Sequence, residues 1–185
     1  MSLSIIANNC AGWRLAETLK EPYQTPTIAL QILPEEFPKL CANLKYYMEQ
    51  RLVEYTKYSE KHREGMIRLL GQEPTFPCGI IGDIAVLFQH ETDFKTAKEK
   101  WDRRKARINY NDLAYVFCLD YKKYAKEAQE LSDLHLPKTF IFTNGFHIPG
   151  PHYFYVVPEG LCFLDVIEGR YVFESNFHRE DLCRH

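Results

Sequence analysis

Three side chains in this chain have the chemistry of catalytic groups: Cys10, Asp83 and His90. A thiol can act as a nucleophile, and a carboxylate or an imidazole can take a proton from a reacting group. Cys10 follows Asn8 and Asn9, whose side-chain amides can bind a ligand or cap a helix. These five residues are the first candidates for a site.

The elements around Cys10 give it two possible roles. Residues 3–7 predict a buried strand and residues 13–20 a short helix, so Cys10 lies in the polar turn between them. Unpaired N–H groups at a helix N-terminus favour negative charge, so a thiol there is expected to have a depressed pKa. Alternatively, Cys10 packs under the turn while the asparagine side chains cap the helix.

Asp83 follows a glycine within an apolar stretch, residues 80–88, that predicts a strand. Gly82 and Asp83 form either the turn of a tight hairpin or a bulge that directs Asp83 to the strand edge. Asp83 and His90 are both candidate general bases, but they lie on opposite faces of a regular strand. They act together only if Gly82 forms a bulge or the strand ends before His90.

A strongly basic helix is predicted from Phe94 to Ile108, and it is the third candidate for ligand binding. Arg103, Arg104 and Arg107 suit recognition of phosphate or carboxylate, and Asn109, just beyond them, is a further ligand-binding candidate. The alternative is a solvated amphipathic face.

The composition favours a globular chain of 185 residues, with 45% hydrophobic and 26% charged residues. A net charge of −2 gives no global attraction to nucleic acid. None of the six cysteines forms a CxxC pair, and no metal site is expected. The N-terminus lacks the pattern of a signal peptide, and no stretch is apolar enough to span a membrane, so we expect a cytoplasmic protein.

Strands and helices alternate over the first two-thirds of the chain, which favours an α/β fold. We predict one domain over residues 1–185, built as a three-layer α/β/α sandwich. Its mixed sheet is mainly parallel, with antiparallel strands near the C-terminus and a loosely ordered tail at 174–185. Asp120 follows a predicted central strand at a common ligand position, whereas His62 falls in a charged stretch and is expected at the surface. No common nucleotide or hydrolase motif occurs, so the sequence indicates no cofactor.

Several segments together resemble the bacterial domain-of-unknown-function family DUF1919. They are S-I-I-A-N-N-C-A-G at 4–12, P-C-G-I-I-G-D-I at 77–84, F-Q-H at 88–90 and K-W-D-R-R-K-A-R-I-N at 100–109. Members are often labelled exopolysaccharide or capsular polysaccharide biosynthesis proteins, so the resemblance implies an α/β fold and a place in glycan assembly. Members often carry an acidic residue and a histidine where this chain has Ala85 and Leu87.

Two functions follow as hypotheses. The first is a transferase that acts on a glycan with an activated sugar or acyl donor; Cys10, Asp83 and His90 are its catalytic candidates, and the arginines hold a donor phosphate. A nucleotide-sugar or another phosphate-bearing small molecule is the expected partner. The second is a non-catalytic accessory protein that binds an anion or a partner protein in the same pathway.

Overall fold

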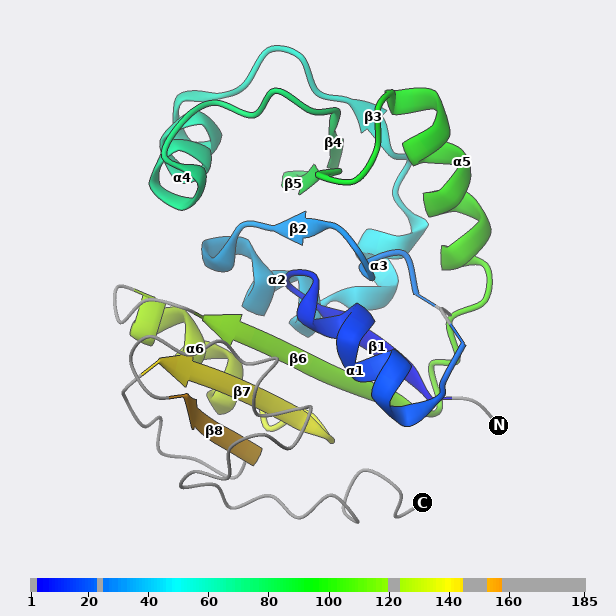
Figure 1. Cartoon of the computed structure of the whole chain (residues 1–185), viewed down its shortest axis with the longest axis vertical. Helices are drawn as coiled ribbons and strands as arrows, with labels where there is room; N and C mark the ends of the chain where they lie inside the picture. Colours follow the sequence, from blue (N-terminus) through cyan, green and yellow to red (C-terminus); the bar gives the residue numbers. More distant parts are fainter. Residues whose placement is uncertain (1–2, 23–24, 120–123, 145–152, 158–185) are drawn as a thin grey trace.

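The computed structural model describes residues 3–22, 25–119, 124–144 and 153–157. Its eight strands form two four-stranded sheets, with helices on both outer faces and between the sheets (Figure 1). The strands are β1 (Ser4–Ala7), β2 (Gln31–Ile32), β3 (Val53–Glu54), β4 (Cys78–Ile81), β5 (Ile84–Leu87), β6 (Leu113–Leu119), β7 (Thr139–Asn144) and β8 (Tyr153–Val157). The helices are α1 (Ala11–Leu19), the 3-10 helix η1 (Pro34–Glu36), α2 (Phe37–Ala42), α3 (Leu44–Glu49), α4 (Glu60–Leu70), α5 (Phe94–Lys105) and α6 (Ala125–Asp133).

Sheet A is parallel and has the strand order β1-β6-β7-β8. All four residues of β1 are buried, as expected for a strand with both faces covered. The free edge of β1 is covered by two fully buried threonines, because Ala7 N donates to Thr27 Oγ1 and Thr25 Oγ1 donates to the Ile5 carbonyl. This edge is therefore closed to further strand pairing.

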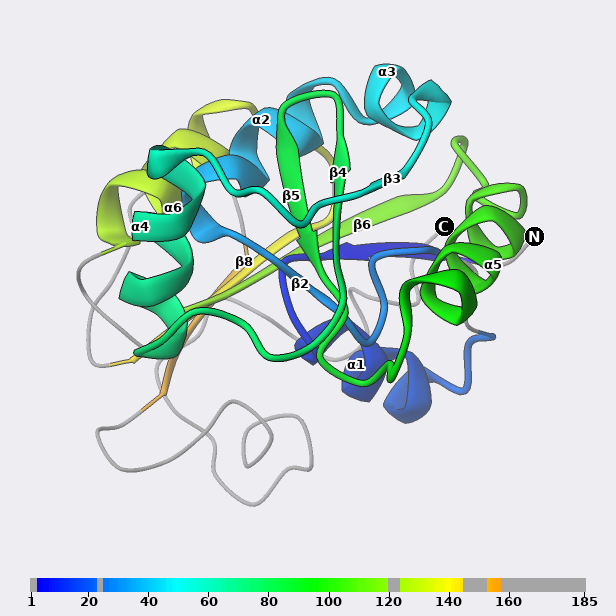
Figure 2. The same ribbon diagram turned by 90° about the horizontal axis from the view of Figure 1, so that it is seen from above.

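Sheet B is antiparallel, with the order β2-β5-β4-β3. Its centre is the β4–β5 hairpin, whose two-residue turn is Gly82-Asp83. Gly82 has φ 59°, which glycine adopts without steric cost. Seen from above, the hairpin crosses the strands of sheet A, and its turn lies beside α2 and α3 (Figure 2).

Three hydrophobic clusters hold these layers together. The largest lies between the sheets, where Ile6 and Phe117 of sheet A share a core with Val86 of sheet B and Trp101 of α5. A second cluster packs α1 on the other face of sheet A, and a third packs α4 on the outer face of sheet B. None of the helices in the described ranges has the length and apolar character that crossing a membrane requires.

The α/β class is confirmed, and the hairpin alternative at Gly82-Asp83 is the one observed. The arrangement of the sheets differs from the prediction, since the antiparallel strands form a separate sheet B in the middle of the chain. Residues 153–157, predicted as an antiparallel addition, instead pair parallel to β7 as β8. The tail at 174–185 lies outside the described residues.

Two elements are shorter than the apolar patterns of their segments. Residues 27–33 have the apolar character of a strand, but only β2 forms there, because Ala29 has φ 62° and the chain turns before Gln31. The helical segment that follows Pro34 is divided at Asn43, whose φ of −130° and ψ of 36° separate α2 from α3.

A tight contact within sheet B gives a test of this packing. A Cβ added at Gly79 would lie 2.6 Å from Leu52 Cδ1 and 3.2 Å from Phe94 Cε2. Gly79→Ala is therefore expected to lower the free energy of unfolding by about 1–3 kcal/mol, as for other overpacked cores. Urea unfolding followed by circular dichroism measures the change.

The double variant Gly79→Ala/Leu52→Ala is the control, because truncating Leu52 removes the nearest clashing atom. Its loss of stability should be smaller than the sum of the two single losses. Additive losses would show that the Gly79–Leu52 contact is not the cause.

Candidate functional site

The structure brings Cys10 and His90 together, although 80 residues separate them in the chain. Cys10 Sγ lies 3.0 Å from His90 Nε2. Cys10 is half-buried and His90 is exposed, so the pair is open to small molecules on one side. A thiol within hydrogen-bond reach of an imidazole is the arrangement of an activated nucleophile and its base.

Asn8 and Asn9 hold the segment that carries Cys10. The Asn8 side chain is 1% exposed and makes two hydrogen bonds to β6: its Nδ2 donates to the Cys118 carbonyl at 3.1 Å, and its Oδ1 accepts from Cys118 N at 2.9 Å. Asn9 Nδ2 donates to the same carbonyl at 3.2 Å, and Asn9 Oδ1 accepts from Ala11 N at 2.9 Å. Both asparagines therefore position the turn, and the Asn9 side chain fixes the first residue of α1.

The expectation of a depressed thiol pKa at Cys10 is wrong. The first-turn N–H groups of α1 already have acceptors, since Gly12 N donates to the Asn9 carbonyl and Trp13 N to the Cys10 carbonyl. Burial raises the pKa of the Cys10 thiol, and a hydrogen bond from its own backbone opposes this only in part. A neutral thiol must lose its proton before it can attack, and the imidazole of His90 is close enough to accept that proton. The reactivity of Cys10 therefore depends on His90 and not on the helix N-terminus.

His90 reaches Cys10 because β5 ends before it. β5 stops at Leu87, and Glu91 N donates to the Phe88 carbonyl at 3.0 Å, which closes a turn with Gln89 and His90 at its centre. Glu91 is fixed in turn by Lys100 of α5, with an N–O distance of 2.7 Å. The condition that the strand end before His90 is thus met.

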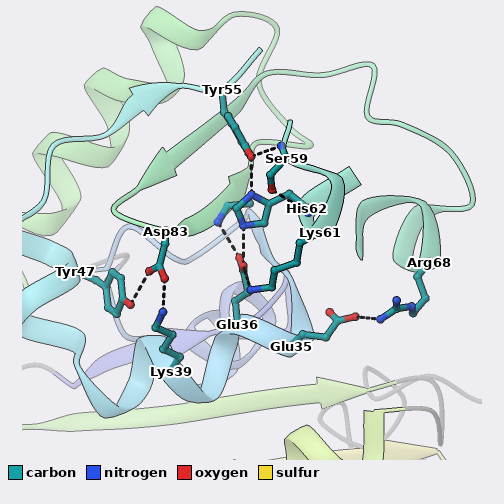
Figure 3. A network of polar contacts seen from close by, with 11 residues as sticks. Glu35, Glu36, Lys39, Tyr47, Tyr55, Ser59, Lys61, His62, Arg68 and Asp83 are labelled. Atoms are coloured by element: carbon teal, nitrogen blue, oxygen red, sulfur yellow. Dashed lines mark hydrogen bonds and ion pairs between the residues drawn. The ribbon is translucent and has the colours of Figure 1, made fainter. Parts of the chain in front are cut away.

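Asp83 lies in the hairpin turn before β5, whereas His90, which contacts Cys10, follows the other end of this strand. The four residues of β5 lie between Asp83 and the turn that carries His90, a span of about 13 Å. Asp83 Oδ1 accepts from Tyr47 Oη at 2.9 Å, and Asp83 Oδ2 pairs with Lys39 Nζ (Figure 3). Lys39, with the Tyr47 hydroxyl, lowers the pKa of Asp83. In this position Asp83 anchors the hairpin turn to α2 and α3.

The basic residues of α5 have different positions: Lys100 contacts Glu91 beside His90, whereas the candidate arginines lie in the last turn of the helix and just beyond it. Phe94, four residues after His90, begins α5, and about 14 Å of helix separates it from Arg103. Beyond the helix, Asn109 N donates to Ser4 Oγ at the start of β1. Arg104 Nη1 donates to the Ile28 carbonyl at 3.0 Å, so it ties α5 to the chain. Arg103 and Arg107 are exposed. The structure does not bring these residues to the Cys10–His90 pair.

A buried polar network was missed by the sequence analysis. Glu36 is 2% exposed; its Oε1 lies 2.8 Å from His62 Nε2, and its Oε2 accepts from Ala85 N at 2.8 Å (Figure 3). His62 Nδ1 lies 2.6 Å from Tyr55 Oη, which also accepts from Ser59 N.

The placement of His62 at the surface is wrong, since the residue is 5% exposed. Its hydrogen bond to the Glu36 carboxylate raises the pKa of His62 to about 9, against the effect of burial. The imidazolium therefore neutralises a carboxylate that would otherwise be costly to bury. This network joins η1, α4 and β5 and has a structural role.

Ala85 and Leu87 belong to the cluster under α4, with Leu33 and Met66. Their apolar side chains pack between sheet B and α4. The Cys10–His90 contact is present although this chain has alanine and leucine at these two positions. Asp120, His147 and His152 lie outside the described residues. Within the described part of the chain, no three His, Cys, Asp or Glu side chains are grouped to hold a metal ion.

The fold and the site define a class: an α/β protein with a thiol–imidazole pair where a parallel sheet meets an antiparallel hairpin. The chain belongs to the family described as a domain of unknown function, DUF1919, whose family model matches residues 1–148. It is also similar to an uncharacterized protein of Haemophilus influenzae, 24% identical over 142 residues. The match covers 77% of this chain, and the chain spans 62% of the length of that relative.

The Glu36–His62 pair predicts a pH dependence of stability. The pKa of His62 is about 9 in the folded chain and 6.5 as an ordinary value. The stability that the pair contributes is thus complete below about pH 6.5 and is lost as the pH rises to about 9. Relative to the wild type, His62→Gln should lack this decrease when urea unfolding is measured between pH 6 and pH 10.

Lys61, a second partner of the Glu36 carboxylate, provides the control. Lys61 also contacts Glu36 Oε1, at 3.2 Å, but its side chain is 71% exposed. Lys61→Ala should cost less than about 1 kcal/mol and keep the pH dependence, whereas His62→Ala should cost about 3–5 kcal/mol because it leaves a buried charge unpaired. Equal losses in the two alanine variants would contradict the assignment.

Proposed function

We propose that this protein is a transferase in the biosynthesis of exopolysaccharide or capsular polysaccharide, and that it moves an acyl group from an activated thioester donor to a glycan hydroxyl. The observation that supports the acyl step is the 3.0 Å separation of Cys10 Sγ and His90 Nε2. The glycan acceptor follows from the resemblance of the motifs to proteins with that label.

The proposed reaction has two steps that use the same two side chains. In the first, His90 Nε2 takes the thiol proton while Cys10 Sγ attacks the carbonyl carbon of the donor. The donor thiolate leaves with that proton, and Cys10 carries the acyl group as a thioester. In the second, His90 takes the proton of the acceptor hydroxyl, whose oxygen attacks the thioester, and the Cys10 thiol is restored.

An acyl donor agrees with the site better than a sugar donor bound through its phosphates. The arginines proposed to hold phosphate lie toward the far end of α5, and Arg104 is bonded to the Ile28 carbonyl. A thiol nucleophile forms acyl intermediates readily, and a thioester donor releases a thiol, which is a good leaving group.

The test is acylation of the protein by a small thioester. Incubation with acetyl-CoA or with S-acetyl-N-acetylcysteamine should add one acetyl group to Cys10, seen by intact mass and located by peptide mapping. Cys10→Ala should remove this adduct, and His90→Ala should slow its formation at pH 7 at least about a hundredfold, the usual lower range for a lost general base.

Asp83→Asn is the matched control, because it changes a carboxylate on the same hairpin at the opposite end. It should be acylated at the wild-type rate. Slow acylation of Asp83→Asn with normal stability would instead restore Asp83 as a candidate base.

The second candidate function, a non-catalytic accessory protein that binds an anion, has one observation in its favour: Arg103 and Arg107 are exposed at the end of α5. No acylation of Cys10 by any thioester, together with thermal stabilisation by simple anions that Arg103→Ala abolishes, would favour this function over the transferase.

A further inference from the structure

The two-residue strand β2 contacts the segments that carry both members of the Cys10–His90 pair. Ile32 N donates to the Asn8 carbonyl at 2.8 Å, two residues before Cys10. Gln31 Oε1 accepts from Gln89 Nε2 at 2.5 Å, one residue before His90. One dipeptide is therefore bonded to both sides of the pair.

The backbone pairing of β2 strengthens this geometry. Gln31 lies opposite Leu87 and Ile32 lies opposite Val86 in the antiparallel ladder. This ladder fixes β5 up to its last residue, Leu87, and then ends. Beyond it, the Gln31–Gln89 side-chain bond continues the connection into the turn that holds His90.

The remaining contacts of this turn act from other directions. The Glu91–Lys100 ion pair ties the turn to α5, and Phe88 N donates to the Pro77 carbonyl at 3.0 Å, which ties it to β4. Among the described residues, the Gln31–Gln89 bond is the side-chain hydrogen bond that links the turn to β2, and so to the Asn8 segment. Gln31 is half-buried, so its polar side chain does not fill the core.

We propose that Gln31 is a positioning residue that fixes His90 at hydrogen-bond distance from Cys10 by holding the Gln89 side chain. The positioning of His90 by Gln31 does not depend on the proposed function; the catalytic importance of that positioning rests on it. A base displaced by about 1 Å can lose up to about a hundredfold in rate, so a single amide bond next to His90 is enough to matter.

The experiment measures the reactivity of the Cys10 thiol, which needs no knowledge of the substrate. Iodoacetamide alkylation of Cys10 in the full chain is followed by peptide mapping between pH 6 and pH 10. Gln31→Leu keeps the size of the side chain but removes the acceptor for Gln89. It should slow alkylation at pH 7 about ten- to a hundredfold, and its pH profile should approach that of His90→Ala.

Two further variants separate positioning from folding. Gln31→Glu keeps an oxygen acceptor for Gln89 Nε2 and should restore most of the wild-type rate. Gln129→Leu removes another glutamine that donates to a side chain, Asp133 on α6, and should leave alkylation unchanged. The melting temperature of Gln31→Leu should stay within about 2 °C of the wild type, since a partly exposed hydrogen bond contributes little.

Wild-type alkylation kinetics in Gln31→Leu would overturn the proposal, and so would a slowing that Gln31→Glu does not reverse. The outcome is independent of the acylation test. If no thioester acylates Cys10 but Gln31→Leu still slows alkylation, the proposed function fails while the positioning role of Gln31 stands.

Discussion

The hydrogen bond from Ile32 N to the Asn8 carbonyl is the contact on which the geometry of the site depends, because it joins the two sheets. Asn8 follows the last residue of β1 in sheet A, and Ile32 belongs to β2 in sheet B. Each sheet alone would hold only one of the two reactive side chains: Cys10 follows β1, and His90 follows β5. A shift of one residue in this contact would turn every side chain of β2 to the opposite face, and Ile32 could not then remain in the core between the sheets.

The buried carboxylate of Glu36 shows how the outer face of sheet B is stabilised. An unpaired charge in this position would cost several kcal/mol, but Glu36 accepts bonds from Ala85 N and His62 and lies near the Lys61 ammonium. Its partners come from β5 and α4, so the carboxylate fixes both elements to η1. The same strand β5 is held at its turn by Asp83, Lys39 and Tyr47 (Figure 3). The hairpin that carries His90 is thus anchored along its length.

Several of these features could be predicted from the sequence because their signals are local. The apolar strands β1 and β6 follow from residue type and spacing, and the Gly82-Asp83 hairpin is one of the two structures that the sequence left open. The meeting of Cys10 and His90 did not follow, since it depends on a tertiary contact between β2 and the turn after β1. The burial of His62 left a weak signal: Met66 follows His62 by four residues and Leu69 follows Met66 by three, so the three share a helix face. Charged neighbours concealed this face, because glutamate, lysine and arginine make up five of the eleven residues of α4.

The β4–β5 hairpin has two different ends: Asp83 anchors its turn to α2 and α3, and His90 contacts Cys10 beyond the end of β5. Asp83 and His90 therefore do not belong to one site. Asp83 and Arg104 contact groups that hold the fold, namely Lys39 and the Ile28 carbonyl. Among the described residues, the His90 side chain has Cys10 as its hydrogen-bond partner, and it lies in an exposed turn held by backbone hydrogen bonds of Phe88 and Glu91. Nucleophilic catalysis requires that the nucleophile and its base are held in a fixed geometry and remain accessible to the substrate. The Cys10–His90 pair, on turns fixed by backbone hydrogen bonds, has this arrangement. Asp83 and Arg104, which the sequence suggested as parts of the chemistry, instead stabilise the fold that holds this pair.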